Sequence, residues 1–255
     1  MKFTDFDKQM RVFENNTDNN TILNGMYIIV RLDGRNFHDY VRIYDFERPF
    51  DKKFRDLMVM TTISLMNNSG FKIIYGYTQS DEISLLFDFN DQTFNRKIRK
   101  IDSILASCCT AYFNKYAKTD IPAMFDCRTI ALPRKEDVLD YFLWRQEDSS
   151  RNALNNYCYW LLRSLGNSKG QATSMLNKKS VSDKNELLFN HNINYNNKPN
   201  WEKRGIGIYY TSTLREGYNW KTEQEQFAIR KQITVNYDLQ MKSKYLDWLE
   251  SIILK

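Results

Sequence analysis

The order of strand-like and helix-like segments in the first 133 residues restricts the fold more than any other feature. Apolar spacing predicts a strand, a helix, two strands, a second helix and a fourth strand. We expect them at residues 27–32, 51–68, 71–77, 82–89, 94–116 and 123–132. This is the split βαβ order of ferredoxin-like folds. Right-handed crossovers then give an antiparallel sheet in the strand order 4-1-3-2.

The rest of the chain is predicted to be mostly helical. We expect an N-terminal helix or arm at residues 1–25 and a division of the chain into a sheet domain (1–133) and a helical region (134–255) packed on it. Helices are expected at residues 134–148, 152–165, 171–176, 183–190 and 242–254, and strands at 205–213 and 232–237. The fold class is therefore α+β.

Composition excludes several kinds of protein. No run of residues approaches the roughly 18 apolar positions of a membrane helix, and the N-terminus carries acids and no apolar h-region, so it is unlike a signal peptide. Four cysteines without CxxC spacing and only two histidines make a zinc site unexpected. We expect reduced thiols and a cytoplasmic protein. A net charge of +6 is compatible with a polyanionic partner without requiring one.

Acidic residues stand where two of the predicted strands end. Asp33 and Gly34 follow the first apolar strand, and Ser80, Asp81 and Glu82 form the turn of the predicted hairpin. The strand order 4-1-3-2 brings these two places together. Crowded carboxylates repel one another, and a pair of Mg²⁺ ions, which prefer oxygen ligands, removes the repulsion and supports phosphoryl chemistry. The alternative is that these acids are ordinary solvated turn residues.

Six motifs occur in one order along most of the chain, and together they resemble those of the tRNA-histidine guanylyltransferase family. They are RLDGRNFH, YTQSDEIS, FDCR, YFLWRQEDSSRN, DKNELLF and NINYNN. The resemblance implies a palm-like domain, related to that of polymerases, that extends RNA in the 3′-to-5′ direction. ATP or GTP would activate the 5′-monophosphate of a tRNA, and the 3′-hydroxyl of an incoming NTP would then attack it. The resemblance also implies a homo-oligomer, commonly a tetramer.

The resemblance assigns roles to individual residues. Asp33, Asp81 and Glu82 would be catalytic, and Asp33, the Gly34 carbonyl and Asp81 would bind two Mg²⁺ ions. The nucleotide would contact Asp33, Gly34, Arg35, Asn36, Phe37, His38, Arg48, Ser80, Asp81, Lys97 and Lys100. Contacts with tRNA are expected from Arg128, Arg145, Gln146, Arg151, Asn152, Lys184, Asn185, Lys203 and Arg204.

For several of these residues a purely structural role remains an alternative. His38 is equally well explained as a structural histidine, and Lys97 and Lys100 as a solvated helix face. Helix capping or surface ion pairs would explain the tRNA-binding candidates. Arg48 stands where the family is expected to have a lysine for the activation step, and arginine and lysine are not interchangeable.

One departure from the family pattern bears on the reaction. Residues 150–156 read SRNALNN where the histidine-tRNA enzymes have HINNLYN. This resembles the guanylyltransferase-like branch, so the sequence favours template-directed 5′-end repair of truncated tRNA. The closest alternative is addition of a single G at position −1 of histidine tRNA. A palm-type nucleotide cyclase and an RNA-binding module without catalysis are more remote alternatives.

Overall fold

The computed structural model describes residues 8, 20–220 and 224–253, so the predicted N-terminal arm lies largely outside the described residues. The strand and helix order of the first half is confirmed. Its elements are β1 (Tyr27–Arg35), α2 (Phe37–Ile43), α3 (Lys52–Asn68), β2 (Ile73–Gln79), β3 (Glu82–Phe87), a 3₁₀ turn at Thr93–Arg96, α4 (Ile98–Ala117) and β4 (Met124–Leu132). The Asp51 side chain caps α3 by accepting a hydrogen bond from the backbone N–H of Phe54.

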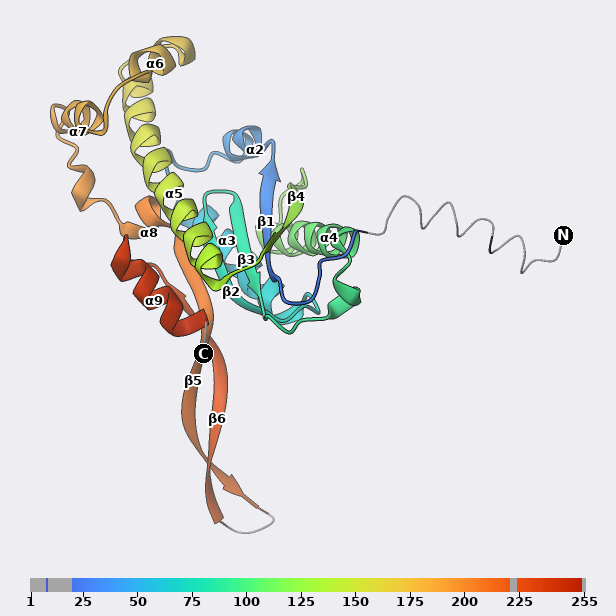
Figure 1. Cartoon of the computed structure of the whole chain (residues 1–255). Coiled ribbons are helices and arrows are strands. Elements are labelled where there is room, and N and C mark those ends of the chain that lie inside the picture. Colours follow the sequence, from blue (N-terminus) through green and yellow to red (C-terminus); the bar gives the residue numbers. More distant parts are fainter. Residues whose placement is uncertain (1–7, 9–19, 221–223, 254–255) are drawn as a thin grey trace.

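The described strands form one antiparallel sheet in the order β4-β1-β3-β2-β5-β6 (Figure 1). Its first four strands have the predicted order 4-1-3-2. The added strands, β5 (Ile206–Asn219) and β6 (Gln224–Asn236), come from the second half of the chain and extend the sheet beside β2. The helical region expected at residues 134–255 therefore also contributes to the sheet.

Helices cover both faces of the sheet. On one face, Val30, Leu32 and Leu85 pack with residues of α3 and α4. On the other, Ile29 and Tyr75 pack with residues of α5 (Lys135–Ser164) and α9 (Ser243–Ile253). Because side chains alternate along a strand, Asp33 lies on the same face as Ile29 and Arg31, under α5.

Helix α5 is one continuous helix of 30 residues, where the sequence predicts two helices separated at residues 149–151. The serines there do not break it, because the Ser149 hydroxyl donates to the carbonyl of Arg145 one turn earlier. The second half of α5 extends past the sheet and packs against α6 (Lys169–Leu176) and α7 (Val181–Phe189) in a separate core. A 3₁₀ turn at Tyr195–Asn197 and the short helix α8 (Asn200–Arg204) then lead into β5.

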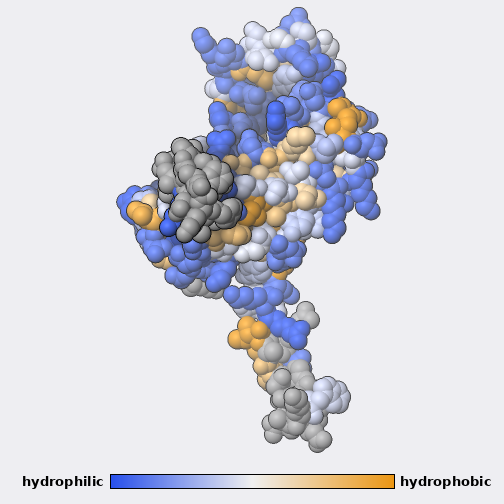
Figure 2. Space-filling view, turned by 90° about the vertical axis from the view of Figure 1, so that its right-hand side faces the viewer, coloured by the Kyte–Doolittle hydropathy of each residue, from blue (hydrophilic) through white to orange (hydrophobic). Residues whose placement is uncertain are grey.

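Strands β5 and β6 are much longer than predicted and form a two-stranded ribbon that projects from the body (Figure 1). The sequence predicts only their ends nearest the body. Further out, Leu214, Phe227 and Ile229 are between 63 and 73% exposed, and Figure 2 shows apolar surface on the projecting ribbon. Along β6, Phe227 and Ile229 continue the alternation of Ile233 and Val235, but Lys231 interrupts it, and the predicted strand begins just after this lysine.

Two local predictions are wrong. Helix α2, which is only seven residues long, is not predicted from the sequence. It follows β1 directly, after Asn36 in the left-handed conformation at φ 59°. Helix α4 begins at Ile98 and not at residue 94, since Phe94, Asn95 and Arg96 all have positive φ. Arg96 is consequently buried and donates to the carbonyl of Met26, although the sequence places it on an exposed helix face.

Candidate active site

The strand order brings the end of β1 against the turn between β2 and β3. Asp33 pairs with Glu82 across the two strands, and the backbone N–H of Gly34 donates to the carbonyl of Asp81 over 3.2 Å. Ser80 makes the short turn possible by adopting φ 53°, and its hydroxyl donates to the Asp81 carboxylate over 3.0 Å. The proximity of Asp33 and Asp81 expected from the topology is therefore present.

The environment of Asp81 disfavours its negative charge. Burial, and after it the neighbouring Asp33 carboxylate, raise the pKa of Asp81 to about 6. Within the described part of the chain, neither Asp33 nor Asp81 forms an ion pair with a lysine or arginine. Two carboxylates this close repel each other, and a bound proton or cation removes the repulsion.

The carboxylates of Asp33 and Asp81 are too few to hold a cation by themselves, but they fit a Mg²⁺ ion that is also bound by a substrate. Among the described residues, no group of three or more histidine, cysteine, aspartate or glutamate side chains could hold a metal ion. Mg²⁺ is usually held by one or two carboxylates together with substrate phosphates and water. The carboxylates of Asp33 and Asp81 satisfy that requirement, and the remaining ligands would come from a bound nucleotide.

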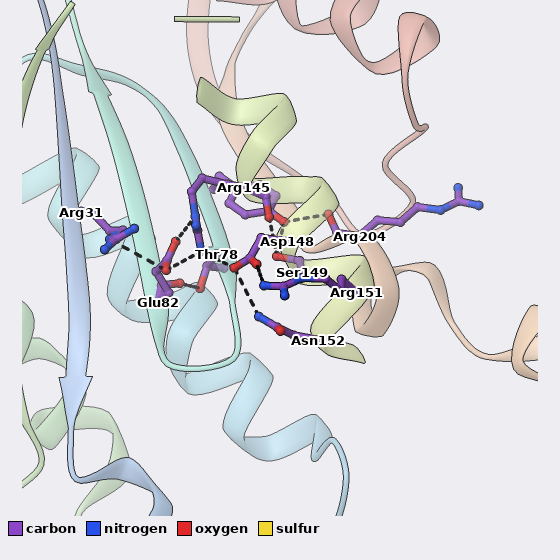
Figure 3. Close-up of polar contacts among 10 residues, drawn as sticks. Arg31, Thr78, Glu82, Arg145, Asp148, Ser149, Arg151, Asn152 and Arg204 are labelled. Atoms are coloured by element: carbon purple, nitrogen blue, oxygen red, sulfur yellow. Dashed lines mark hydrogen bonds and ion pairs between the residues drawn. The ribbon is translucent and has the colours of Figure 1, made fainter. Parts of the chain in front are cut away.

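Glu82, expected to be catalytic, forms an ion pair with Arg145 instead. Figure 3 shows its carboxylate facing α5, where Nε and Nη2 of Arg145 donate to its two oxygens over 2.8 Å each. Burial raises the pKa of Glu82, and the charge of Arg145 counteracts this. Arg145 also donates to Asp148 over 3.1 Å. The network ties the turn that carries Asp81 to α5, so we assign Glu82 a structural role.

A cleft opens beside the carboxylate pair. It has a volume of about 490 Å³ and lies between α2, the segment after it and the second half of α5. Such a volume is within the range of small-molecule sites. It is lined by Phe37, His38, Val41, Arg48, Pro49, Phe54, Ser80, Asp81, Asn155, Asn156, Tyr159, Trp160 and Thr173. A smaller hollow of about 250 Å³ contains Asp33 and shares Ser80, Asp81, Asn155 and Asn156 with it.

The structure gathers only some of the predicted nucleotide contacts at this cleft. His38, Arg48, Ser80 and Asp81 line it together. Phe37 reaches it from the core, where its ring contacts those of Phe54, Phe113 and Phe125. Arg35 and Asn36 are exposed and line a different hollow, next to Ile43 and Ile121.

Lys97 and Lys100 lie at the opposite end of the sheet. Arg96, just before them, bonds to Met26 at the start of β1, whereas Asp33 is near the end of that strand. At about 3.3 Å per residue, the strand between Met26 and Asp33 spans ~20 Å. Contact of these lysines with a nucleotide stays a prediction, and the start of α4 places them near the start of β1 and away from its Asp33 end.

Burial also corrects the predicted tRNA contacts. Arg145, Gln146 and Lys203 are buried, and they bond to Glu82, to the carbonyl of Gln240 and to the carbonyl of Asn196 respectively. A fourth, Arg204, donates to the carbonyl of Leu239. These four residues hold the fold together. The accessible candidates that remain are Arg128, Arg151, Asn152, Lys184 and Asn185, of which the last two are half-buried on α7.

Sequence reasoning missed Asn155, Asn156 and Trp160, which line the cleft from α5. The spacing of four residues between Asn156 and Trp160 places them on one face of a helix. That signal is present in the sequence, since these residues fall within the helix predicted at residues 152–165, but helical spacing alone does not distinguish a cleft wall from any other helix face. The family pattern draws attention only to the histidine and tyrosine that residues 150–156 lack.

Gly34 is needed for space. A Cβ added at Gly34 would lie 2.3 Å from Cδ2 of Phe37, whose ring is held by three other aromatic rings. We expect Gly34→Ala to lower the free energy of unfolding by ~1–3 kcal/mol, because a buried ring must move. Thermal unfolding measures this. Gly170→Ala is the matched control, since no atom lies within 4 Å of its added Cβ, and it should leave stability unchanged or raise it.

Two carboxylates at neighbouring strand ends of an antiparallel palm-like sheet, open to a cleft of this size, are characteristic of enzymes that transfer nucleotides through paired metal ions. The fold and the site thus define a nucleotidyltransferase.

Comparison with known proteins identifies the family. The family model described as tRNAHis guanylyltransferase matches residues 7–133, and that of the Thg1 C terminal domain matches residues 136–250. The tRNA(His) guanylyltransferase of Neurospora crassa is 35% identical over 217 residues, 81% of this chain and 74% of that protein. The one from Candida glabrata is 31% identical over 196 residues, 72% of this chain and 83% of that protein. The chain belongs to the tRNA(His) guanylyltransferase family.

Solved structures agree with this assignment. A bacterial Thg1-like protein in complex with ATP has a TM-score of 0.76 at 27% identity and covers 98% of this chain and 100% of its own. The same type of protein in complex with GTP has a TM-score of 0.72 at 28% identity, with the same coverage. The Saccharomyces cerevisiae tRNA(His) guanylyltransferase has a TM-score of 0.69 at 29% identity, over 78% of this chain and 91% of its own.

Proposed function

We propose that this protein adds a guanylate to the 5′ end of histidine tRNA. The observation that carries the proposal is that the cleft opens onto the edge where Asp33 and Asp81 meet. The relatives named tRNA(His) guanylyltransferase support this reaction more than the template-directed repair that the sequence favours.

The reaction proposed has two transfers. The 5′-phosphate of the tRNA attacks the α-phosphorus of ATP or GTP and releases pyrophosphate. The 3′-hydroxyl of GTP then attacks the activated 5′-phosphorus, and the nucleoside monophosphate leaves. ATP and GTP complexes of the bacterial Thg1-like protein support both nucleotides as substrates. Two Mg²⁺ ions held by Asp33, Asp81 and the Gly34 carbonyl would neutralise charge on the phosphates.

The side chains around the cleft position these reactants. His38 is exposed to it and can donate a hydrogen bond to a phosphate oxygen, and Arg48 supplies a positive charge there. Ser80 is exposed to it as well, and its single O–H would have to turn away from Asp81 to reach a phosphate. Catalysis would then consist of holding the 5′ end and the nucleotide in line, as in other phosphoryl transfers.

The tRNA would bind through exposed basic residues, so its affinity should fall as salt rises. Arg151 of α5 is an accessible candidate in the region 134–255, to which we assign tRNA binding as part of the same proposal. Arg128 on β4 is an accessible candidate in the sheet domain. The apolar ribbon supports a homo-oligomer, because a two-stranded ribbon is marginally stable alone in water.

Among the described helices none has the length and hydrophobicity that crossing a membrane needs. All four cysteines are free, which supports a reducing compartment such as the cytoplasm.

Template-directed 5′-end repair is the second candidate. The bacterial Thg1-like structure covers nearly the whole chain, and residues 150–156 lack the histidine and tyrosine of HINNLYN. Both observations favour the repair branch over single-nucleotide addition.

The two candidates separate in one assay. Labelled 5′-monophosphorylated histidine tRNA without position −1 and a tRNA without its first nucleotide are incubated with the protein, Mg²⁺, ATP and NTPs. Extension of the first RNA by one G supports our proposal, and preferential, complementary extension of the second supports repair. Extension of neither contradicts both, and release of cyclic nucleotide without RNA would indicate a cyclase.

A further inference from the structure

The Arg48 side chain rests on an aromatic ring from a distant part of the chain. Its guanidinium carbon lies 5.0 Å from the ring centroid of Trp160, a cation–π contact. Arg48 belongs to the segment between α2 and α3, and Trp160 to the second half of α5. Both residues line the cleft of about 490 Å³ together with Ser80 and Asp81. The contact therefore joins the two walls of the candidate nucleotide site.

The charge of Arg48 remains available to a ligand. Within the described residues no aspartate or glutamate forms an ion pair with Arg48. An aromatic ring engages one flat face of a guanidinium and leaves its N–H groups, which lie in the plane, free to donate. Arg48 is thus a positive charge held in place at the cleft wall with unused donors. Its complementary ligand is an anion with several oxygens, such as a polyphosphate.

We propose that Trp160 is a positioning residue that holds the Arg48 guanidinium for the polyphosphate of the activating nucleotide. This inference rests on the proposed function, in which ATP or GTP activates the 5′ end. A lysine at position 48 would not need the indole, since its ammonium is a flexible point charge without a planar face. Arg48 and Trp160 therefore act as a matched pair.

The pair should matter for activation and not for the later transfer. A 5′-triphosphorylated tRNA carries its own leaving group. The 3′-hydroxyl of GTP attacks its α-phosphorus, a new O3′–P bond forms, the α–β phosphoanhydride bond breaks, pyrophosphate leaves and the hydroxyl proton is released. No activating ATP is consumed. Comparing monophosphorylated with triphosphorylated tRNA thus separates the two transfers in one protein.

The experiment measures extension of both RNAs by wild type, Trp160→Ala, Trp160→Phe, Arg48→Lys and the Arg48→Lys/Trp160→Ala double variant. We expect Trp160→Ala to raise the KM for ATP on monophosphorylated tRNA about tenfold with little change in kcat. Extension of triphosphorylated tRNA should be unchanged. Trp160→Phe should keep most of the wild-type KM, and Arg48→Lys should cost as much as Trp160→Ala. The double variant should be no worse than either single one.

Direct ATP binding by calorimetry provides a second readout that does not depend on turnover, and the Kd of Trp160→Ala should rise about tenfold. Arg42→Lys, an exposed arginine of α2 paired with Asp39, is the control and should behave as wild type. Equal losses on both RNAs, or additive losses in the double variant, would overturn the inference. An unchanged Kd would overturn it too. If wild type extends neither RNA, the proposed function fails, and the Kd still decides the role of Trp160 in nucleotide binding.

Discussion

Replacing Asp81 by asparagine should abolish nucleotidyl transfer and at the same time stabilise the metal-free protein. Asp81 and Asp33 lie together at the edge of the sheet, and the neutral amide of asparagine is a much weaker ligand for Mg²⁺ than a carboxylate. Loss of residues that only orient metal ligands already costs roughly 10–100-fold, so loss of a ligand should cost at least ~100-fold. The rate of 5′ extension at saturating Mg²⁺ measures this.

The gain in stability follows from the raised pKa of Asp81. The group ionises at its ordinary value of 3.8 in the unfolded chain and at about 6 in the native protein. Its stabilising contribution is complete below pH 3.8 and is lost as the pH rises through 6. The gap corresponds to at most ~3 kcal/mol at pH 7, which asparagine would recover. Below pH 4, position 81 should contribute equally to the free energy of unfolding in wild type and in Asp81→Asn.

Thermal unfolding in EDTA at pH 4 to 8 tests the pH dependence. Asp140→Asn is a matched control, because Asp140 is an exposed acid on α5, away from the carboxylate pair. It should change neither stability nor activity. An Asp81→Asn protein that is less stable than wild type at pH 7, or that keeps its activity, would contradict this view of the carboxylate pair.

Removing Arg145 should have the largest effect on folding. Its side chain is 9% exposed and satisfies Glu82, which is 18% exposed, and also Asp148 (Figure 3). Arg145→Met would leave Glu82 with only the more distant Arg31, at 3.9 Å, whereas Asp148 would keep Arg151. Breaking a buried pair from one side costs ~3–5 kcal/mol. Since whole domains are stable by only about 5–15 kcal/mol, the melting temperature should fall sharply.

Two variants show whether an unpaired buried charge causes the loss of stability in Arg145→Met. Arg151→Gln removes an arginine that also pairs with Asp148 but is 73% exposed, and it should cost less than ~1 kcal/mol. Glu82→Gln combined with Arg145→Met removes the buried acid together with its partner and should recover part of the loss. Equal destabilisation by Arg145→Met and Arg151→Gln in chemical denaturation would show that burial of the pair is irrelevant.

The sequence predicts the parts of this fold that depend on periodic apolar residues. Four strands and two helices in a ferredoxin-like order leave one compact arrangement, and this is why the sequence alone brings Asp33 and Asp81 together. Their positions at strand ends are visible as abrupt changes of polarity after apolar segments.

The sequence does not predict which polar residues are buried. Arg145, Gln146 and Lys203 are expected to contact tRNA, but each is itself buried and bonds to another part of the protein. Likewise, the outer part of the β5–β6 ribbon is not predicted, because Lys231 interrupts the apolar alternation of β6. The start of α4 is wrongly predicted because it depends on three residues with positive φ, which composition does not reveal.

Calorimetric titration of Mg²⁺ in the presence of a non-hydrolysable ATP analogue tests whether Asp33 and Asp81 share cations. Wild type should bind two ions per chain, and Asp33→Asn and Asp81→Asn should each lose at least one of them. Binding of Mg²⁺ with the same stoichiometry and affinity by wild type and both variants would contradict the assignment of these acids as the site of nucleotidyl transfer.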